Sequence, residues 1–417
     1  MTAISDRPVR PKPYLMQNQI QHYEWGTRDK DAFIPRLMGI APQPGVPYGE
    51  LWMGAHPKAP SAVFVDDQPV ALDRWIAEHP QELLGKSVSS RFDRKLPFLL
   101  KVLSAGEALS IQAHPNKAQA RQLHAEAPEH YPDDNHKPEV AIALDSLTAL
   151  MGIRPVADLA TTLSQYPEIA EFVGADVASR VQAAYALSPQ KQRDTAKLLF
   201  TTLITRSVSQ PDALSQTIAK LSHRLGSRKR EPTEVETLFL TLQQKYPGAD
   251  VGLLCVFLMN LVRLSAGEAM FAEAGVPHAY LKGNIIECMA NSDNVVRVGL
   301  TLKYKDARSL LEILRYEPGP VKILGGTSVG GTVVYKTPAP EFRVSRFDVA
   351  AGANRHVSTA GRPCIMVVTA GEIVLRYAGG HEVCRRGQSV FVPAILPEYS
   401  IFSAQPSVVF KAEIPVR

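Results

Sequence analysis

The sequence predicts a mainly β protein whose strands are interrupted by an α-helical insert. Before residue 156, short apolar runs stand between prolines and glycines, a pattern typical of strands in a sandwich or barrel. Between 156 and 264, apolar residues recur at spacings of three and four, which is typical of helices. After 264, short apolar runs separated by glycines return and continue to the end of the chain.

The clearest strand candidates before the insert are Ser-Ala-Val-Phe-Val at 61–65 and Leu-Pro-Phe-Leu-Leu-Lys-Val-Leu at 96–103. After the insert, the runs at 332–335, 364–368 and 389–392 predict the strands of a small all-β unit. Runs of this length between turn-forming residues are too short for typical helices. Both flanks of the insert are therefore expected to be β structure.

The insert contains several segments with helical spacing, each bounded by proline. Proline lacks a backbone N–H and fits the first turn of a helix, so prolines at these boundaries mark helix ends. The apolar run at 251–264 is about 14 residues long, short of the ~20 needed to span a bilayer, and is expected to be a buried helix. The periodic segments lie at 176–187, 190–205, 213–225 and 233–245.

Composition places the chain among ordinary globular proteins. Its 417 residues suggest two or three domains at ~150 residues each. The 46 Lys and Arg against 41 Asp and Glu give a net charge of +5, too small to indicate a nucleic-acid partner, although net charge leaves a local basic groove open. The N-terminus lacks the apolar core of a secretory signal. The four cysteines form no CxxC pair, so reduced thiols in the cytoplasm are expected; they are Cys255, Cys288, Cys364 and Cys384.

The first candidate site segment is Ser-Ile-Gln-Ala-His-Pro at 110–115. On a strand, residues two apart share a face, so Ser110, Gln112 and His114 are expected to point together. Gln112 and His114 are then candidate metal ligands, although glutamine is an uncommon zinc ligand. The alternative is a histidine that bonds a turn at a strand end.

Two further segments carry candidate chemistry. Pro-Asp-Asp-Asn-His-Lys-Pro-Glu at 132–139 offers Glu139 as a metal carboxylate, and His136 and Lys137 as acid–base or anion-binding groups. Its alternative is a charged surface loop. His278 follows a proline at a strand or turn boundary, where it is either a metal ligand or a satisfied core histidine.

Glu287 and Arg297 stand within apolar, strand-like sequence. A charge buried there needs a partner or a ligand, so the two either pair with each other or bind a ligand. Gln112, His114, Glu139 and His278 together offer two imidazoles, one carboxylate and one amide. Such a set leaves Zn²⁺ at a net charge of about +1 and able to take a further oxygen ligand. The residues alone therefore support a plausible mononuclear metal site in a β-rich domain.

Beyond that point, the segments resemble the type I phosphomannose isomerases, a family of mannose-6-phosphate isomerases. The matching runs occur in the same order along nearly the whole chain, although the helical insert and the C-terminal unit match only in their pattern of apolar residues and in their position. The longest matching run, Glu-Cys-Met-Ala-Asn-Ser-Asp-Asn-Val-Val-Arg at 287–297 continued by Val-Gly-Leu-Thr-Leu-Lys to 303, is highly specific. The other matching runs lie at 21–26, 49–57, 96–103, 110–115, 135–139 and 277–280.

The resemblance implies a cupin fold in three parts. A jelly-roll catalytic barrel is expected from residues 1–155 with 265–325, a helical domain inserted in it from 156–264, and a second jelly roll from 326–417. The second jelly roll is expected to bind no metal, because Pro397 and Glu398 stand where cupins often carry a histidine.

The resemblance also implies roles for individual residues. One Zn²⁺ per chain would be held by Gln112, His114, Glu139 and His278, with Arg297 as the active-site arginine. The implied reaction interconverts mannose 6-phosphate and fructose 6-phosphate by ring opening, removal of the C2 proton, a cis-enediol intermediate and return of the proton to C1. The remaining pocket positions are Lys137 and Glu287 for proton transfer, His136 for ring opening, and Ser110, Lys101, Asp293 and Lys303 for substrate binding.

The sequence departs from the family pattern at Leu302, where the family has a proline. Proline fixes φ and stiffens a loop, so its loss affects the expected placement of Lys303 more than the zinc site. The stretch at 271–275, just before His278, is also more polar than expected for that strand.

Other classes of protein are alternatives. A cupin oxygenase would favour Fe(II) held by two histidines and a carboxylate, which Gln112 argues against. A non-catalytic sugar-phosphate-binding cupin would lack the acid–base groups that Lys137, Glu287 and Arg297 supply. A related isomerase acting on another sugar or on unphosphorylated mannose stays open. The expected partner is a small sugar phosphate, with no nucleic acid or membrane, and the chain is expected to be a cytoplasmic monomer or weak homo-oligomer.

Overall fold

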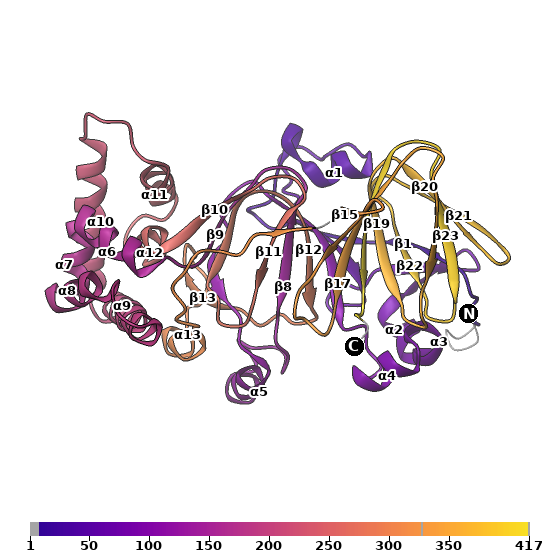
Figure 1. Cartoon of the computed structure of the whole chain (residues 1–417), viewed down its shortest axis with the longest axis horizontal. Helices are drawn as coiled ribbons and strands as arrows, with labels where there is room; N and C mark the ends of the chain where they lie inside the picture. The colour runs from indigo at the N-terminus through magenta and orange to yellow at the C-terminus, as the bar shows by residue number, and fades with distance from the viewer. Residues whose placement is uncertain (1–7, 327, 416–417) are drawn as a thin grey trace.

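The strands of the protein gather into two β units that lie next to each other, with a helical unit at one end (Figure 1). The computed structural model describes residues 8–326 and 328–415. Every pair of adjacent strands within the described residues runs antiparallel. Antiparallel strands can be joined by short turns, as the proline- and glycine-rich flanks of the insert predict. The antiparallel arrangement holds in both β units.

The first β unit is an 11-stranded sheet that surrounds the candidate site. Its main path follows the order β14-β11-β8-β12-β6-β3-β2, and four further strands extend it: β7 and β9 pair with β12, β13 pairs with β7, and β10 pairs with β9. The path strands are β14 (Leu324–Gly325), β11 (Glu268–Ala272), β8 (Glu139–Ala143), β12 (His278–Ala290), β6 (Phe98–Ala105), β3 (Glu50–Gly54) and β2 (Gln19–Gln21). The others are β7 (Ile111–Ala113), β9 (Leu147–Ile153), β10 (Met259–Leu264) and β13 (Val296–Gly299).

Strand β12 connects two parts of this sheet because it bends at Gly283. The first half of β12 pairs with β7 and β9, and the second half pairs with β6 and β8. Gly283 has φ +133°, and a side chain there would collide with the carbonyl oxygen of Ser146, so the bend requires glycine. The bend lets one strand carry His278 in one layer and Glu287 in the other.

The second β unit is a nine-stranded sheet faced by a four-stranded one, with a shared apolar core that includes Phe347, Tyr399 and Val409. Its C-terminal strands are β15 (Ser328–Val329), β16 (Thr332–Tyr335), β17 (Arg343–Val349), β19 (Cys364–Ala370), β22 (Ser389–Val392) and β24 (Ser407–Glu413). The facing strands are β18 (Asn354–Ser358), β20 (Glu372–Tyr377), β21 (Gly380–Arg385) and β23 (Glu398–Phe402).

Three N-terminal strands belong to this second unit. They are β1 (Tyr14–Gln17), β4 (Ala62–Val65) and β5 (Gln68–Ala71). Strand β1 pairs with β22, with Leu15 opposite Val390, and β4 pairs with β1. All of 1–155 was expected in the catalytic part, but in the structure β1 pairs with β22, more than 300 residues away, and β4 and β5 continue that sheet from β1. Local sequence pattern does not specify such a partner.

The helical unit occupies the end of the molecule opposite the second β unit (Figure 1). The four expected helices are confirmed, and three of them begin where proline or a capping residue starts a first turn. Thr233 and Glu236 form a capping box at the start of α11. The helices are α6 (Val156–Gln165), α7 (Pro167–Val173), α8 (Ala175–Ala184), α9 (Pro189–Ser209), α10 (Pro211–Gly226), α11 (Glu234–Lys245) and α12 (Gly252–Leu258).

The expectation of one buried helix over 251–264 is wrong in its second half. Helix α12 ends at Leu258, and the following residues form β10, which pairs with β9 from Met259 opposite Ile153 to Leu264 opposite Leu147. Asn260 donates through Nδ2 to the carbonyl oxygens of Met151 and Ile153. A short apolar run has no intrinsic preference strong enough to resist pairing with an available strand edge.

Short helices also occur where the sequence analysis expected only strands and turns. They are η2 (Asp29–Asp31), α1 (Phe33–Met38), α2 (Leu72–Glu78), α3 (Pro80–Leu84), α4 (Lys86–Arg91), α5 (Lys117–Glu126) and α13 (Ala307–Ile313). Within the residues that the structure describes, no helix is long and apolar enough to cross a membrane.

Candidate metal centre

Three buried side chains from distant parts of the chain meet inside the first β unit. His114 follows β7, Glu139 begins β8 and His278 begins β12. One ligand atom from each lies within 4.8 Å of the others. Nε2 of His278 is 2.8 Å from Oε1 of Glu139, and Nε2 of His114 is 3.4 Å from Oε2 of the same carboxylate. The structure therefore brings together three of the four residues expected to bind metal.

The hydrogen bond at Nδ1 of each imidazole determines that Nε2 is the nitrogen available to bind a metal. Nδ1 of His114 lies 2.8 Å from the carbonyl oxygen of Asn294, and Nδ1 of His278 lies 3.0 Å from that of Val276. A carbonyl oxygen only accepts hydrogen bonds, so each Nδ1 carries the hydrogen and donates it. In the neutral form of each ring, the Nε2 lone pair then points toward Glu139, as in ligand histidines that are oriented by their surroundings.

The atoms that face one another at the centre of this cluster are buried and lack hydrogen-bond partners. Among the described residues, this holds for Nε2 of His114, Nε2 of His278 and Oε2 of Glu139. Burial, together with the Lys137 charge, lowers the pKa of His114 to about 4, which keeps that ring neutral near pH 7. Unpartnered polar atoms in a dry interior are costly unless something binds them. Two neutral imidazoles and a carboxylate are donors that suit Zn²⁺.

Gln112 lies beside this cluster on the neighbouring strand. It is the direct cross-strand partner of His278, so both side chains project from the same face of the sheet. Tyr280, two residues along β12 from His278, donates its hydroxyl to Oε1 of Glu139 at 3.1 Å. The sequence analysis did not select Tyr280, although its spacing of two from a candidate ligand on a strand was a usable signal.

Arg297 extends the same row of side chains. It pairs with Gln112 across β13 and β7, so Arg297, Gln112 and His278 stand side by side on three adjacent strands. Within the part of the chain that the structure describes, no carboxylate forms an ion pair with Arg297; in particular, the proposed pairing with Glu287 does not occur. Burial lowers the pKa of Arg297 below its ordinary value. A half-buried guanidinium without a counter-ion is suited to an anionic ligand.

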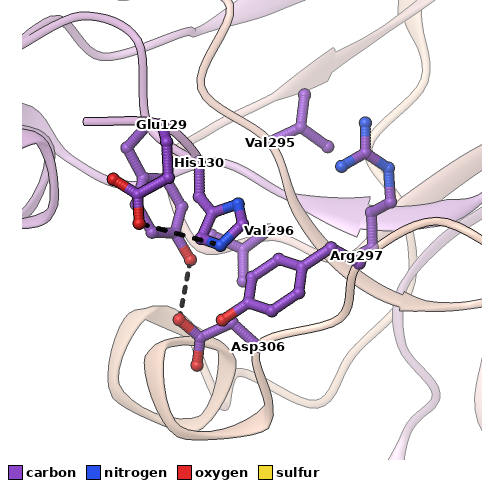
Figure 2. Close-up of a pocket in the computed structure, with 8 residues that line it drawn as sticks. Glu129, His130, Val295, Val296, Arg297 and Asp306 are labelled. Carbon is purple, nitrogen blue, oxygen red and sulfur yellow. Dashed lines mark hydrogen bonds and ion pairs between the residues drawn. The ribbon is translucent and has the colours of Figure 1, made fainter. Parts of the chain in front are cut away.

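Arg297 also borders a cavity of about 150 Å³ that is lined by residues at β13, after it, and in the loop after α5. Figure 2 shows this cavity, with the guanidinium of Arg297 extending away from Asp306. The His130 ring stacks on the Tyr304 ring with their centroids 3.8 Å apart, and the Tyr131 hydroxyl donates to Oδ2 of Asp306. These contacts fasten the segment that follows β13 to the loop after α5.

Lys101 and Glu287 form a buried cross-strand pair on β6 and β12, with Nζ 2.9 Å from Oε2. A second carboxylate, Glu50 on β3, lies 3.5 Å from the same Nζ and accepts a hydrogen bond from the Trp52 indole. Burial acts to lower the pKa of Lys101, but the two carboxylates raise it above its ordinary value. Burial raises the pKa of Glu287. Lys101 is therefore already paired with two carboxylates.

Glu50 was missed by the sequence analysis, although a usable signal exists. It stands in the run Glu-Leu-Trp-Met-Gly of β3, all of whose residues are buried. A charge inside such a run needs a partner, and the same argument had selected Glu287.

The segment before Glu139 contributes two more candidates. Nζ of Lys137 lies 3.9 Å from Oε2 of Glu139, with its side chain 11% exposed. His136 contacts the second β unit, because its Nε2 lies 2.7 Å from Oε1 of Glu341. Glu341 lies between β16 and β17, and nothing local in the sequence connects it to residue 136.

Asp293 is held by two basic residues that follow β3. Nζ of Lys58 lies 2.7 Å from its Oδ2, and Nε2 of His56 lies 3.5 Å from the same atom. Burial acts to raise the pKa of Asp293, but the Lys58 contact holds it below its ordinary value. No role was predicted for His56 from the sequence.

The remaining two candidates lie apart from these contacts. Ser110 is half-buried just before β7, and Lys303 is exposed on the turn after β13, beside Leu302 at 98% exposure. Within the described residues, neither side chain forms a hydrogen bond or ion pair with the metal-ligand candidates. The flexibility expected from Leu302 in place of proline concerns this exposed turn.

The fold and the cluster define a mainly antiparallel β protein with a buried candidate mononuclear metal centre. Residues 14–156 match the model of the phosphomannose isomerase type I catalytic domain. The mannose-6-phosphate isomerase of Rattus norvegicus is 37% identical over 402 residues, covering 93% of this chain and 94% of the relative. The chain therefore belongs to the type I phosphomannose isomerase family.

Solved structures agree with this assignment. The crystal structure of a phosphomannose isomerase variant from Salmonella typhimurium matches with a TM-score of 0.84 at 30% identity, covering 97% of this chain and 100% of that chain. A structure described as mannose 6-phosphate isomerase bound with zinc and yttrium matches with a TM-score of 0.83 at 30% identity and the same coverage. The phosphomannose isomerase fold expected from the sequence is thereby confirmed.

Proposed function

We propose that this protein is a zinc-dependent aldose–ketose isomerase that interconverts mannose 6-phosphate and fructose 6-phosphate. The observation that carries the proposal is the cluster of His114, Glu139 and His278, whose facing atoms are buried and unpartnered. It occurs in a chain 37% identical to a mannose-6-phosphate isomerase over nearly its full length. A similar solved structure is described as bound with zinc.

His114, Glu139 and His278 would hold one Zn²⁺ per chain, with the amide oxygen of Gln112 as the fourth protein ligand. The donor chemistry supports this assignment, since both imidazoles present Nε2 lone pairs and Gln112 lies on the same face as His278. When bound, the ion would supply Lewis-acid stabilisation of negative charge on substrate oxygens.

The proton transfer would be carried by side chains of the chain itself. His136 would assist ring opening, and a base would then remove the C2 proton to give a cis-enediol and return the proton to C1. Lys137 and Glu287 are the candidates for that base. Burial raises the pKa of Glu287, and a raised pKa favours a role for this carboxyl in proton transfer.

Arg297 would stabilise the enediolate that forms during this transfer. Its guanidinium stands two strands from His278 in one row of side chains, and it carries a positive charge without a carboxylate partner among the described residues. A planar guanidinium is suited to hold two adjacent oxygens by two hydrogen bonds. Its contribution would therefore be greatest in the transition state.

Ser110, Lys101, Asp293 and Lys303 are proposed to contact the substrate. The charge of Lys101 is already paired with Glu50 and Glu287. Lys101 would therefore bind sugar hydroxyls, or position the two carboxylates, more readily than it would bind the phosphate as a free cation. Asp293 would act together with Lys58 and His56. Lys303, exposed and without an acidic partner among the described residues, is the better candidate for the phosphate dianion.

The direct test is a coupled assay of fructose 6-phosphate formation from mannose 6-phosphate, after chelation and again after addition of Zn²⁺. We expect activity to be lost and then restored. An enzyme that binds Zn²⁺ but shows no turnover of mannose 6-phosphate would overturn the proposal. Assays with unphosphorylated mannose and with other sugar phosphates would then separate a related isomerase from a non-catalytic sugar-phosphate-binding protein.

We further propose that the two β units are cupin jelly rolls. The catalytic barrel would be drawn from 1–155 and 265–325 apart from β1, β4 and β5, and the second roll from 326–417 together with those three strands. Because β10 pairs with β9, we propose that the helical insert, expected over 156–264, ends with α12 at Leu258. Cys255, Cys288, Cys364 and Cys384 are all buried and free, which supports a reducing, cytoplasmic location. The chain would act as a monomer or weak homo-oligomer.

A further inference from the structure

The position of Arg297 is set by its backbone. Within the described residues, its guanidinium has no carboxylate partner, so no ion pair fixes the side chain. Regular pairing of β13 with β7 holds Val296 opposite Ala113 and Arg297 opposite Gln112. The register then shifts before Gly299. What holds the chain immediately beyond Arg297 therefore decides where the guanidinium can reach.

The chain beyond Arg297 is held by Asp250, a buried residue near the end of the helical unit, just before α12. Its Oδ1 accepts hydrogen bonds from the backbone amides of Leu300 and Gly252, both at 2.8 Å. Its Oδ2 accepts from the amide of Thr301 at 3.3 Å. One carboxylate thus ties the first turn of α12 to the two residues that follow β13. Charge-assisted bonds of this kind are stronger than bonds between neutral groups.

The two backbones are also in direct contact at this point. A side chain at Gly299 would collide with the amide nitrogen of Gly252 and with Asp250, and a Cβ at Gly252 would lie 2.6 Å from the amide nitrogen of Leu300. Leu300 itself has φ +56°, a left-handed conformation that L-residues adopt only when their surroundings require it. The junction is therefore closely packed and conformationally specific.

We propose that Asp250 is a positioning residue for Arg297, and that through it the helical insert takes part in catalysis. This inference rests on the proposed isomerase function, in which Arg297 stabilises the enediolate. Among the described residues, the Asp250 side chain contacts the backbone amides named above and Nζ of Lys305, 3.8 Å from its Oδ2, but no side chain of a candidate substrate-binding residue. It acts by holding Leu300 and Thr301 where the strand carrying Arg297 ends.

A double-mutant cycle between Asp250 and Arg297 tests the proposal. Asp250→Asn keeps the size of the side chain but places an NH₂ group where one carboxylate oxygen accepts from the backbone. We expect kcat to fall about 10–100-fold with a much smaller change in KM, because a misplaced group costs most in the transition state. In an Arg297→Ala background, Asp250→Asn should lower kcat no further.

A matched control separates positioning from loss of stability. Glu236 is another buried carboxylate of the helical unit, and it accepts from the Thr233 amide and from Arg228 and Arg230. Glu236→Gln should lower Tm while leaving the kcat of the native protein unchanged. If Asp250→Asn lowers Tm without lowering kcat, or lowers kcat equally in the presence and absence of Arg297, the proposal is wrong.

Gly252→Ala provides a second route if Asp250→Asn does not fold. Its added methyl group pushes on the amide of Leu300 from the same side, so it should show the same dependence on Arg297. The unsubstituted protein is assayed for mannose 6-phosphate turnover in the same series. Inactivity there overturns the proposed function and the role of Asp250 with it, whereas an active parent with independent effects of the two substitutions overturns only the role of Asp250.

Discussion

The Nε2 atom of His136 lies 2.7 Å from Oε1 of Glu341, which connects the candidate site to the second β unit. The other oxygen of Glu341 is buried and has no hydrogen-bond partner among the described residues. Because the carboxylate accepts the Nε2 hydrogen, Nδ1 of His136 is the nitrogen left to exchange a proton. The second β unit thereby supplies a group that orients a proposed catalytic side chain.

Replacing Glu341 should therefore impair catalysis without loss of metal. We expect Glu341→Ala to lower kcat about tenfold or more, within the range that general acid–base groups contribute, with zinc content unchanged. Steady-state kinetics and elemental analysis check both. Glu398→Ala is a suitable control, since Glu398 pairs with His356 at 3.2 Å on the exposed surface. Equal kcat values for the two variants would remove Glu341 from the mechanism.

The metal centre predicts a connection between zinc and thermal stability. A ligand that binds only the folded state raises Tm as its concentration increases. Zn²⁺ should therefore raise the Tm of the chelated protein, and His278→Ala should abolish both the shift and the retained zinc. His223→Ala, on an exposed part of α10, serves as the control and should behave like the unsubstituted protein. Full zinc occupancy in His278→Ala, measured by elemental analysis, would exclude His278 as a ligand.

The buried group of Lys101, Glu50 and Glu287 predicts a stability defect that a second substitution relieves. Lys101→Met leaves two buried carboxylates without their shared cation, which should cost about 3–5 kcal/mol in the free energy of unfolding. Adding Glu50→Gln removes one of those charges and should recover part of the loss. Urea unfolding of the single and double variants measures this. If the two substitutions have simply additive destabilising effects, the three residues do not act as one electrostatic group.

A different carboxylate predicts how stability depends on acid. Burial acts to raise the pKa of Glu413, but Lys411, at 2.8 Å, and Arg343 hold it below its ordinary value of 4.5. A depressed folded-state pKa contributes stability that is present above the unfolded-state pKa and is lost as the pH falls through the folded-state value. Stability should therefore fall as the pH drops below 4.5.

Glu413→Gln should make the unfolding free energy less sensitive to pH in that acidic window and should lower it near pH 7. Urea unfolding at a series of pH values measures the slope. Glu24→Gln is the control, since Glu24 pairs with Arg28 but is 90% exposed and its pair is screened by solvent. A Glu413→Gln profile that runs parallel to that of the unsubstituted protein would contradict the assignment.

Local sequence was sufficient to predict four helices of the helical unit and to select candidate metal ligands. Prolines at 189 and 211 mark helix starts, and His114, a candidate chosen from strand spacing, lies in the cluster with Glu139 and His278. These features depend on residues close together in the chain. They could be predicted because helix starts and strand alternation are local properties.

Features formed by distant segments were not predictable in the same way. The pairing of β1 with β22, the strand β10 in place of a helix, and the contacts of Glu341 and Asp250 all join segments at least 50 residues apart. A carboxylate gives no local sign of which distant amide or imidazole it will meet. Glu50 is the exception, because its charge within a fully apolar run already indicated a buried partner.

Arg297 gives the most specific prediction about the chemistry, because charge and geometry can be separated there. Arg297→Ala should retain zinc and fold normally, since no ion pair among the described residues depends on it, yet lower kcat by orders of magnitude. Arg297→Lys keeps the positive charge but loses the planar pair of donors, so it should restore only part of the activity. Arg308→Ala, 87% exposed on α13, is the control and should be fully active. If the kcat of Arg297→Lys equals that of the unsubstituted enzyme, a positive charge alone is enough. If Arg297→Ala retains full turnover, Arg297 does not stabilise the enediolate, and the row that it forms with Gln112 and His278 has another function.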